Sequence, residues 1–157
     1  MWARPPTQKV DSSARRYCRC VRTLHSAYRV TDLAASLDFY TALGYDQVGR
    51  VDIGEGASLT MLKFPGDELV TLELVNRPAE GPVATGNGFS HIAVQVDNLS
   101  VTIEALSQMG LRAGPVEHPG GPDGPKTSWL SDPDGYRIEL VQWPPGHADG
   151  ITAADFG

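Results

Sequence analysis

The chain has 157 residues, of which 41% are hydrophobic and 20% charged, and its mean hydropathy is −0.22. This composition allows one packed domain or two half-domains that share a core, and it excludes a disordered chain and a large multidomain protein. Residues 1–22 hold six of the thirteen basic residues and one acid, Asp11. The rest of the chain therefore carries a net charge of −11, which disfavours binding to nucleic acid phosphates.

The N-terminal residues give no sign of a membrane or export segment. No window approaches 18 consecutive apolar residues, and no apolar stretch follows the basic region. We therefore expect a cytoplasmic protein. Residues 1–22 have no apolar periodicity and are expected to be a disordered basic extension, in which Cys18 and Cys20 are incidental thiols.

The remaining elements are predicted from apolar periodicity, capping residues and turn residues, in chain order. Asp32 and Asn98 are expected to cap two helices, which end near Gly44 and Gly110. The predicted strands cover Leu24–Val30, Asp46–Ile53, Ser58–Phe64 and Leu69–Val75, and then Phe89–Val96, Arg112–Glu117, Thr127–Leu130 and Tyr136–Gln142.

An internal repeat relates the two sets of elements. Residues 25–44 align without a gap to residues 91–110 at an offset of 66, and the same offset carries Leu72–Val75 onto Ile138–Val141. The chain is therefore predicted to be an α+β protein of two βαβββ modules that form an open eight-stranded mixed sheet or barrel. The expected boundaries are an extension at 1–22, modules at 23–77 and 89–143, a linker at 78–88 and a tail at 144–157.

Four polar residues recur at equivalent repeat positions where the pattern otherwise favours apolar ones: His25, Glu73, His91 and Glu139. A carboxylate on a half-buried strand face is costly unless it is paired or binds a cation. A single strand histidine or glutamate is weak evidence for a site, but one offset maps His to His and Glu to Glu. Two imidazoles and two carboxylates suit a divalent first-row transition metal, with open positions for water or substrate.

The chain resembles the vicinal oxygen chelate superfamily, and within it the glyoxalase I type, over about Leu24 to Trp143. The stretches that carry the resemblance surround these four residues, and they include Gly88-Phe-Ser-His91 and Asp132-Pro-Asp-Gly-Tyr-Arg-Ile-Glu139. The resemblance implies that the metal ligands are His25, Glu73, His91 and Glu139. The histidine at the first ligand position makes the chain similar to the bacterial type of the enzyme, which prefers Ni²⁺ or Co²⁺, with Zn²⁺ as the alternative. The resemblance also implies a homodimer whose metal site combines one module from each chain.

The implied reaction converts the hemithioacetal of a 2-oxoaldehyde and a thiol into a 2-hydroxyacyl thioester through an enediolate, as in methylglyoxal detoxification. Glu139 would be the base, with Glu73 as ligand and possible partner base. Arg29 matches the position that holds the carboxylate of the thiol, and Lys126 could approach the substrate from its loop. Asn76 is one residue short of the family's thiol-contacting asparagine, which leaves the identity of the thiol open.

Two other readings within the superfamily stay open. One is a metal-dependent dioxygenase or epimerase, and the other is a metal-free drug-binding protein of the bleomycin-resistance kind. Glu73 argues against the first, because a dioxygenase needs only two histidines and one glutamate. The four intact ligand positions argue against the second, because a pure binder has no physical need for two inward carboxylates.

Overall fold

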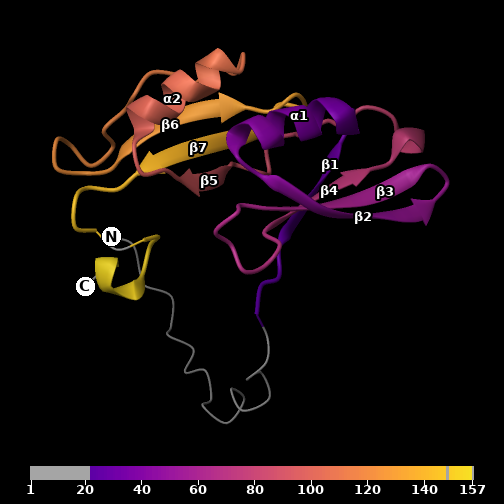
Figure 1. Cartoon of the computed structure of the whole chain (residues 1–157), viewed down its shortest axis with the longest axis horizontal. Helices are drawn as coiled ribbons and strands as arrows, with labels where there is room; N and C mark the ends of the chain where they lie inside the picture. The colour runs from indigo at the N-terminus through magenta and orange to yellow at the C-terminus, as the bar shows by residue number, and fades with distance from the viewer. Residues whose placement is uncertain (1–21, 148, 157) are drawn as a thin grey trace, which may run out of the picture.

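The computed structural model describes residues 22–147 and 149–156. Most of the predicted N-terminal extension, with Cys18 and Cys20, lies outside the described residues. The strands form one sheet of four and one of three, and both helices lie on one side of these sheets (Figure 1). The elements are β1 Ser26–Val30, α1 Leu33–Leu43, β2 Asp46–Gly54, β3 Ala57–Lys63, β4 Leu72–Asn76, the short helix η2 Pro78–Glu80, β5 Ile92–Gln95, α2 Leu99–Gln108, β6 Lys126–Ser131, β7 Arg137–Gln142 and the short helix η3 Ala153–Phe156.

Each sheet has a parallel pair made from the first and last strands of its half of the chain. The first sheet has the order β1-β4-β3-β2, with β1 parallel to β4. The second has the order β5-β7-β6, with β5 parallel to β7. We call β1–β4 with α1 the first half and β5–β7 with α2 the second half. The α+β class predicted from the sequence is confirmed.

The helix ends follow the predicted capping chemistry. The side chains of Asp32 and Asn98 accept hydrogen bonds from the backbone N–H groups of Ala35 and Val101, both at 3.1 Å. Gly44 and Gly110 follow the two helices with φ of 111° and 84°, a left-handed conformation that a side chain would strain. Both helices therefore start and stop where local side-chain chemistry predicts.

The expected strand over Arg112–Glu117 is not formed as a strand. The segment runs beside β6, where the Gly114 N–H donates to the Trp129 carbonyl at 2.8 Å, and it pairs through a single bridge between Glu117 and Thr127. Pro115 has no N–H to donate, so a continuous ladder cannot form there. The described residues therefore contain seven strands rather than eight, and the barrel is not closed.

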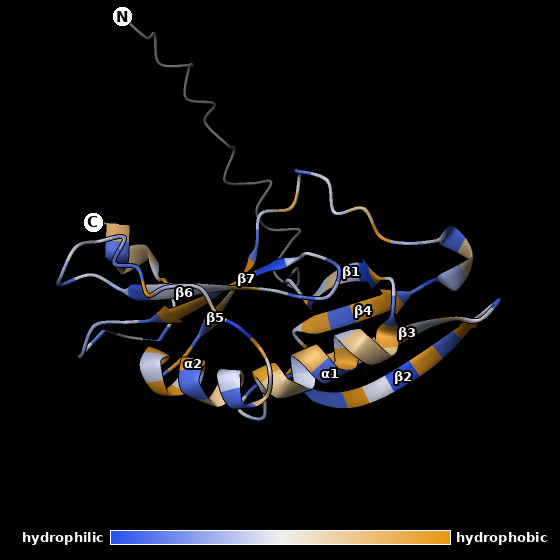
Figure 2. Cartoon of the chain, turned by 90° about the horizontal axis from the view of Figure 1, so that it is seen from above, coloured by the Kyte–Doolittle hydropathy of each residue, from blue (hydrophilic) through white to orange (hydrophobic). Residues whose placement is uncertain are grey.

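The core lies between the sheets and the two helices. Burial alternates along β4, which buries Leu72 and Leu74 while Glu73 between them points to the other face. The same alternation in β7 buries Ile138 and Leu140 on either side of Glu139. Orange bands alternate with blue along β4 in Figure 2. The core packing thus turns both glutamates toward the faces opposite the helices.

A buried polar chain joins the two halves. The Tyr28 hydroxyl donates to the Tyr40 hydroxyl, which donates to Asp132 Oδ2 at 3.0 Å, and the rings of Tyr28 and Tyr136 lie 4.3 Å apart. Burial raises the pKa of both bonded tyrosines and also that of Asp132, which is 5% exposed. These hydrogen bonds run from Tyr28 in β1 to Asp132 in the turn before β7. They therefore fix one half against the other.

Among the described residues, no helix is both long and apolar enough to span a bilayer.

Candidate metal centre

The first His–Glu pair joins the start of β1 to the middle of β4. His25 directly precedes β1, and Glu73 lies opposite Ala27 in the parallel ladder. This register brings His25 Nε2 to 3.2 Å from Glu73 Oε2, with side-chain exposures of 28% and 12%. The pair is therefore half-buried and still open to a ligand.

The second His–Glu pair repeats this geometry in the other sheet. His91 directly precedes β5, and Glu139 lies opposite Ala93 in the parallel ladder. His91 Nε2 lies 3.3 Å from Glu139 Oε2, with side-chain exposures of 33% and 19%. The offset of 66 residues thus predicts not only matching residue types but matching contacts.

The four predicted ligands form two separate pairs within one chain. Among residues 22–147 and 149–156, no group of three or more His, Cys, Asp or Glu side chains is placed to hold a metal ion. Each pair provides one imidazole nitrogen and one carboxylate oxygen. This is half of the donor set that the sequence predicts.

The second pair has neighbours that the sequence reasoning missed. Trp129 lies opposite Glu139 across the antiparallel ladder, and its ring meets the His91 ring edge-on with centroids 5.1 Å apart. The guanidinium carbon of Arg137 lies 4.0 Å from the centre of the same indole. The signal was present in the alternation of β6, which puts Trp129 on the face of Glu139 once the register is known.

The three predicted substrate-binding residues lie in different surroundings. Asn76 is 8% exposed, and its side-chain amide donates to the carbonyls of Val30 at 3.3 Å and Thr31 at 3.4 Å. It therefore holds the end of β1 within the fold. Lys126 is exposed at the start of β6 and lines a cleft of about 440 Å³ that also includes Trp143. The structure does not bring Asn76 and Lys126 together.

Arg29 is held by the linker between the halves. Its guanidinium donates to the Gly81 carbonyl at 2.8 Å and pairs with the Glu80 carboxylate at 3.2 Å. Glu80 also lies 3.7 Å from the guanidinium of Arg77, whereas the buried Nε of Arg29 has no hydrogen-bond partner among the residues that the structure describes. Arg29 is thus already bound to a carboxylate of its own chain.

The family comparison agrees with this geometry. The sequence pattern of the Glyoxalase/Bleomycin resistance protein/Dioxygenase superfamily matches residues 22–140, which include both His–Glu pairs. The chain belongs to this superfamily. The matched region also contains both sheets almost completely.

Within the superfamily, the chain is similar to proteins named lactoylglutathione lyase. One from Neisseria meningitidis serogroup A is 35% identical over 129 residues, which cover 78% of this chain and 91% of that protein. One from Escherichia coli O157:H7 is also 35% identical over 129 residues and is covered to 93%. Both matches span nearly the whole relative.

The solved structures of this superfamily show the same fold. The trypanothione-dependent glyoxalase I of Leishmania major has a TM-score of 0.63 at 27% identity, with 78% of this chain and 86% of that chain covered. A glyoxalase I variant of Zea mays has a TM-score of 0.68 at 27% identity, covering 78% of this chain and 46% of the maize chain. A bleomycin-binding protein, at 21% identity and a TM-score of 0.56, shares the fold.

The donor chemistry fits the divalent metal that this superfamily generally uses. Imidazole nitrogens and carboxylate oxygens suit first-row divalent transition metals, and each His–Glu contact brings one donor of each kind to within 3.2 or 3.3 Å of the other. The residues present therefore fit the group that the family implies.

Proposed function

We propose that this chain is a metal-dependent lyase of the glyoxalase I type, acting on the hemithioacetal of a 2-oxoaldehyde and a thiol. The enzyme class predicted from the sequence agrees with the lactoylglutathione lyases of 35% identity. The observation that carries the proposal is the pair of equivalent His–Glu contacts, at 3.2 and 3.3 Å, inside the matched region. A cytoplasmic location remains our prediction.

The proposed metal ligands are His25, Glu73, His91 and Glu139. A bound divalent ion would act as a Lewis acid that polarises the two adjacent oxygens of the substrate and so acidifies the neighbouring C–H. We favour Ni²⁺ or Co²⁺, with Zn²⁺ as the alternative, because a histidine stands at the first ligand position. Carboxylates and imidazoles at these positions accept each of these ions.

The proposed base is Glu139. Its carboxylate would take the proton from one substrate carbon and return it to the neighbouring carbon, so that no redox cofactor is needed. Glu139 is more exposed than Glu73, at 19% against 12%, and the indole of Trp129 lies beside its His91 partner. Glu73 would serve as ligand and as the possible partner base.

The separation of the two pairs supports a site shared between two chains. Each chain provides two half-sets of ligands, so a homodimer in which the first half of one chain faces the second half of its partner would complete two sites. The strand β2 exposes Val48 at 49% and Val51 at 50%, which leaves apolar surface on the first half for a partner to cover.

The thiol has to compete with Glu80. A thiol whose carboxylate binds Arg29 must displace an ion pair of 3.2 Å that is already formed within the chain. A thiol without that carboxylate would leave the pair intact. We therefore propose the thiol only as a class, and Arg29 as its contact.

A metal-by-thiol screen tests the proposed reaction. The purified chain is loaded with Ni²⁺, Co²⁺ or Zn²⁺ and supplied with methylglyoxal and a panel of thiols, and thioester formation is followed. Turnover with at least one combination is expected. Retained metal without turnover on any thiol would instead favour a dioxygenase or epimerase, and tight binding of bleomycin without metal would favour the drug-binding reading.

A mixing experiment tests whether the site is shared. His25→Ala and His91→Ala are each expected to be inactive, because each removes one ligand from every site. A mixed dimer of the two variants would contain one site with all four ligands, so mixing after partial unfolding should restore part of the activity. If the sites form within single chains, mixing restores nothing.

A further inference from the structure

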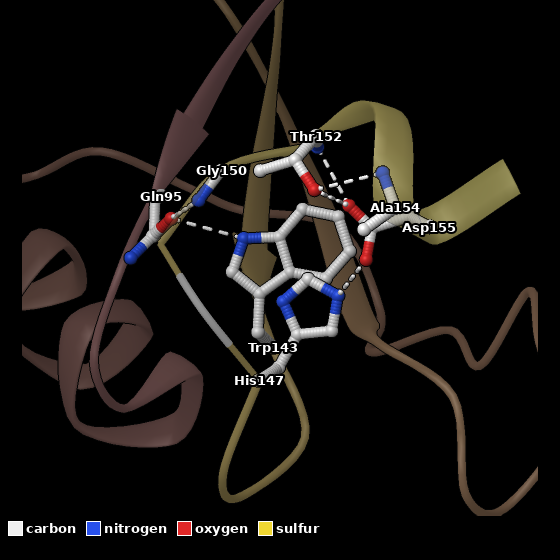
Figure 3. Close-up of polar contacts among 7 residues, drawn as sticks. All are labelled: Gln95, Trp143, His147, Gly150, Thr152, Ala154 and Asp155. Atoms are coloured by element: carbon white, nitrogen blue, oxygen red, sulfur yellow. Dashed lines mark hydrogen bonds and ion pairs between the residues drawn. The ribbon is translucent and has the colours of Figure 1, made fainter. Parts of the chain in front are cut away.

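The C-terminal segment, residues 143–147 and 149–156, folds back onto the second half instead of extending away from it. One side chain of β5 makes the contacts. Gln95 Oε1 accepts hydrogen bonds from Trp143 Nε1 and from the Gly150 N–H, both at 2.9 Å, and Gln95 Nε2 donates to Asp149 Oδ1 at 2.7 Å (Figure 3). A single amide therefore anchors three points of the segment.

The segment also closes on itself. The rings of Trp143 and His147 stack with centroids 4.5 Å apart and an angle of 11° between their planes. His147 Nε2 lies 3.2 Å from Asp155 Oδ1, and the other oxygen of Asp155 accepts from the Thr152 N–H at 2.6 Å. These bonds from Thr152 lower the pKa of Asp155, which favours its charged form. His147 is thus a packed part of this segment.

The segment lies on the sheet face that carries the second His–Glu pair. Val94 points into the core, so Ala93 and Gln95 point to the opposite face. Ala93 lies opposite Glu139 in the parallel ladder and Gln95 lies opposite Val141, one repeat of two residues further along. In Figures 1 and 2 the sheet separates α2 from the C-terminal turn η3. The anchor therefore stands about 7 Å along the strands from the rung of Glu139.

The internal repeat gives the first half an equivalent arrangement. Gln95 aligns with Arg29 at the offset of 66, and each side chain holds the segment that follows the last strand of its half. Arg29 holds the linker through Glu80 and Gly81. The two anchored segments differ in their anchors, because the linker is held by the guanidinium of Arg29 whereas the C-terminal segment is held by the neutral Gln95 beside the indole of Trp143.

We infer that the C-terminal segment is a wall of the active site that receives the side chain of the aldehyde and limits its size. This inference rests on the proposed function. The guanidinium of Arg29 suits a charged group of the thiol. The C-terminal segment carries Asp149 and Asp155, which would repel a carboxylate, and it presents the indole of Trp143 at Gln95, which lies opposite Val141 in the ladder. The neutral end of the substrate therefore points to the wall held by Gln95, which acts as a positioning residue.

The test compares two aldehydes with one thiol. Gln95→Ala should release the wall and raise the kcat/KM ratio of phenylglyoxal to methylglyoxal by about tenfold, because the larger ring gains room. Trp143→Phe, which removes the indole N–H and keeps an aromatic ring, should shift the ratio in the same direction by less. The matched control is Gln108→Ala, an exposed glutamine at the end of α2 on the far side of the sheet.

Hydrogen exchange of the C-terminal segment provides a readout that does not depend on turnover. Gln95→Ala should speed exchange in residues 149–156, whereas Gln108→Ala should leave it unchanged. If Gln95→Ala speeds exchange but leaves the kcat/KM ratio of phenylglyoxal to methylglyoxal unchanged, the segment does not limit the size of the aldehyde and the inference is wrong. If exchange is unchanged, Gln95 does not anchor the segment. If the wild-type protein turns over no aldehyde, the proposed function fails while the exchange result still decides the anchor.

Discussion

The two halves of the chain build the same His–Glu contact in different surroundings. Across the antiparallel ladder, Glu73 lies opposite Met61, whereas Glu139 lies opposite Trp129. Within the described part of the chain, only the second pair has an aromatic ring against its histidine. The repeat thus explains which residues can bind a metal, and the residues that face them across the ladder distinguish one glutamate from the other.

The largest expected effect comes from replacing the two equivalent glutamates, because only one of them is the proposed base. Glu139→Gln keeps the shape of the side chain and removes the proposed base, so kcat should fall by about 10²- to 10⁴-fold while the fold is preserved. Glu73→Gln is the matched variant in the first half and should mainly lower the amount of retained metal. Steady-state kinetics, metal analysis and circular dichroism measure these effects. Full activity of Glu139→Gln would refute the assigned base.

The next effect tests Trp129, the ring that contacts the histidine of the second pair. Trp129→Ala removes the edge-on contact that orients His91, and we expect metal affinity to fall by about 10- to 100-fold. Trp129→Phe keeps a ring and should recover most of the affinity. The first-half counterpart, Met61→Ala, should change affinity less. Equilibrium dialysis against Ni²⁺ measures all three, and equal losses for Trp129→Ala and Met61→Ala would contradict the asymmetry.

A smaller effect concerns the bonds that join the halves. Tyr40→Phe leaves the buried Asp132 without its hydroxyl donor and should lower the free energy of unfolding by about 1–3 kcal/mol. Tyr28→Phe keeps that bond and should cost only about 0.5–1.5 kcal/mol. Urea titrations measure the difference. Tyr40→Phe removes both bonds and Tyr28→Phe removes only one, so equal costs would show that the bond from Tyr40 to Asp132 adds no stability.

The smallest expected effect is a pH dependence from Asp132. Burial raises the pKa of this carboxyl, so the folded state keeps its proton to a higher pH than the unfolded chain does. Its contribution to stability is therefore present at low pH and is lost as the pH rises through the folded-state pKa. The unfolding free energy of the wild type relative to Asp132→Asn should fall from about pH 4 toward neutrality. A constant difference over that range would contradict the raised pKa.

Sequence reasoning succeeded where the relevant physics is local or repeated. The caps at Asp32 and Asn98 depend on neighbours three residues away, and the alternation around Glu73 and Glu139 places both carboxylates on the open face. It failed over Arg112–Glu117, where apolar residues suggested a strand. Pro115 interrupts the ladder there, and pairing depends on where β6 lies.

The sequence by itself determined the α+β class, the 66-residue repeat and the two identical His–Glu combinations, because period, capping and repetition are readable along a chain. Only the tertiary structure decided that these ligands form two separate pairs, that Arg29 forms an ion pair with Glu80, and that Gln95 anchors the C-terminal segment. Those contacts join residues far apart in the sequence. They follow from strand register and chain reversal, which no local pattern specifies.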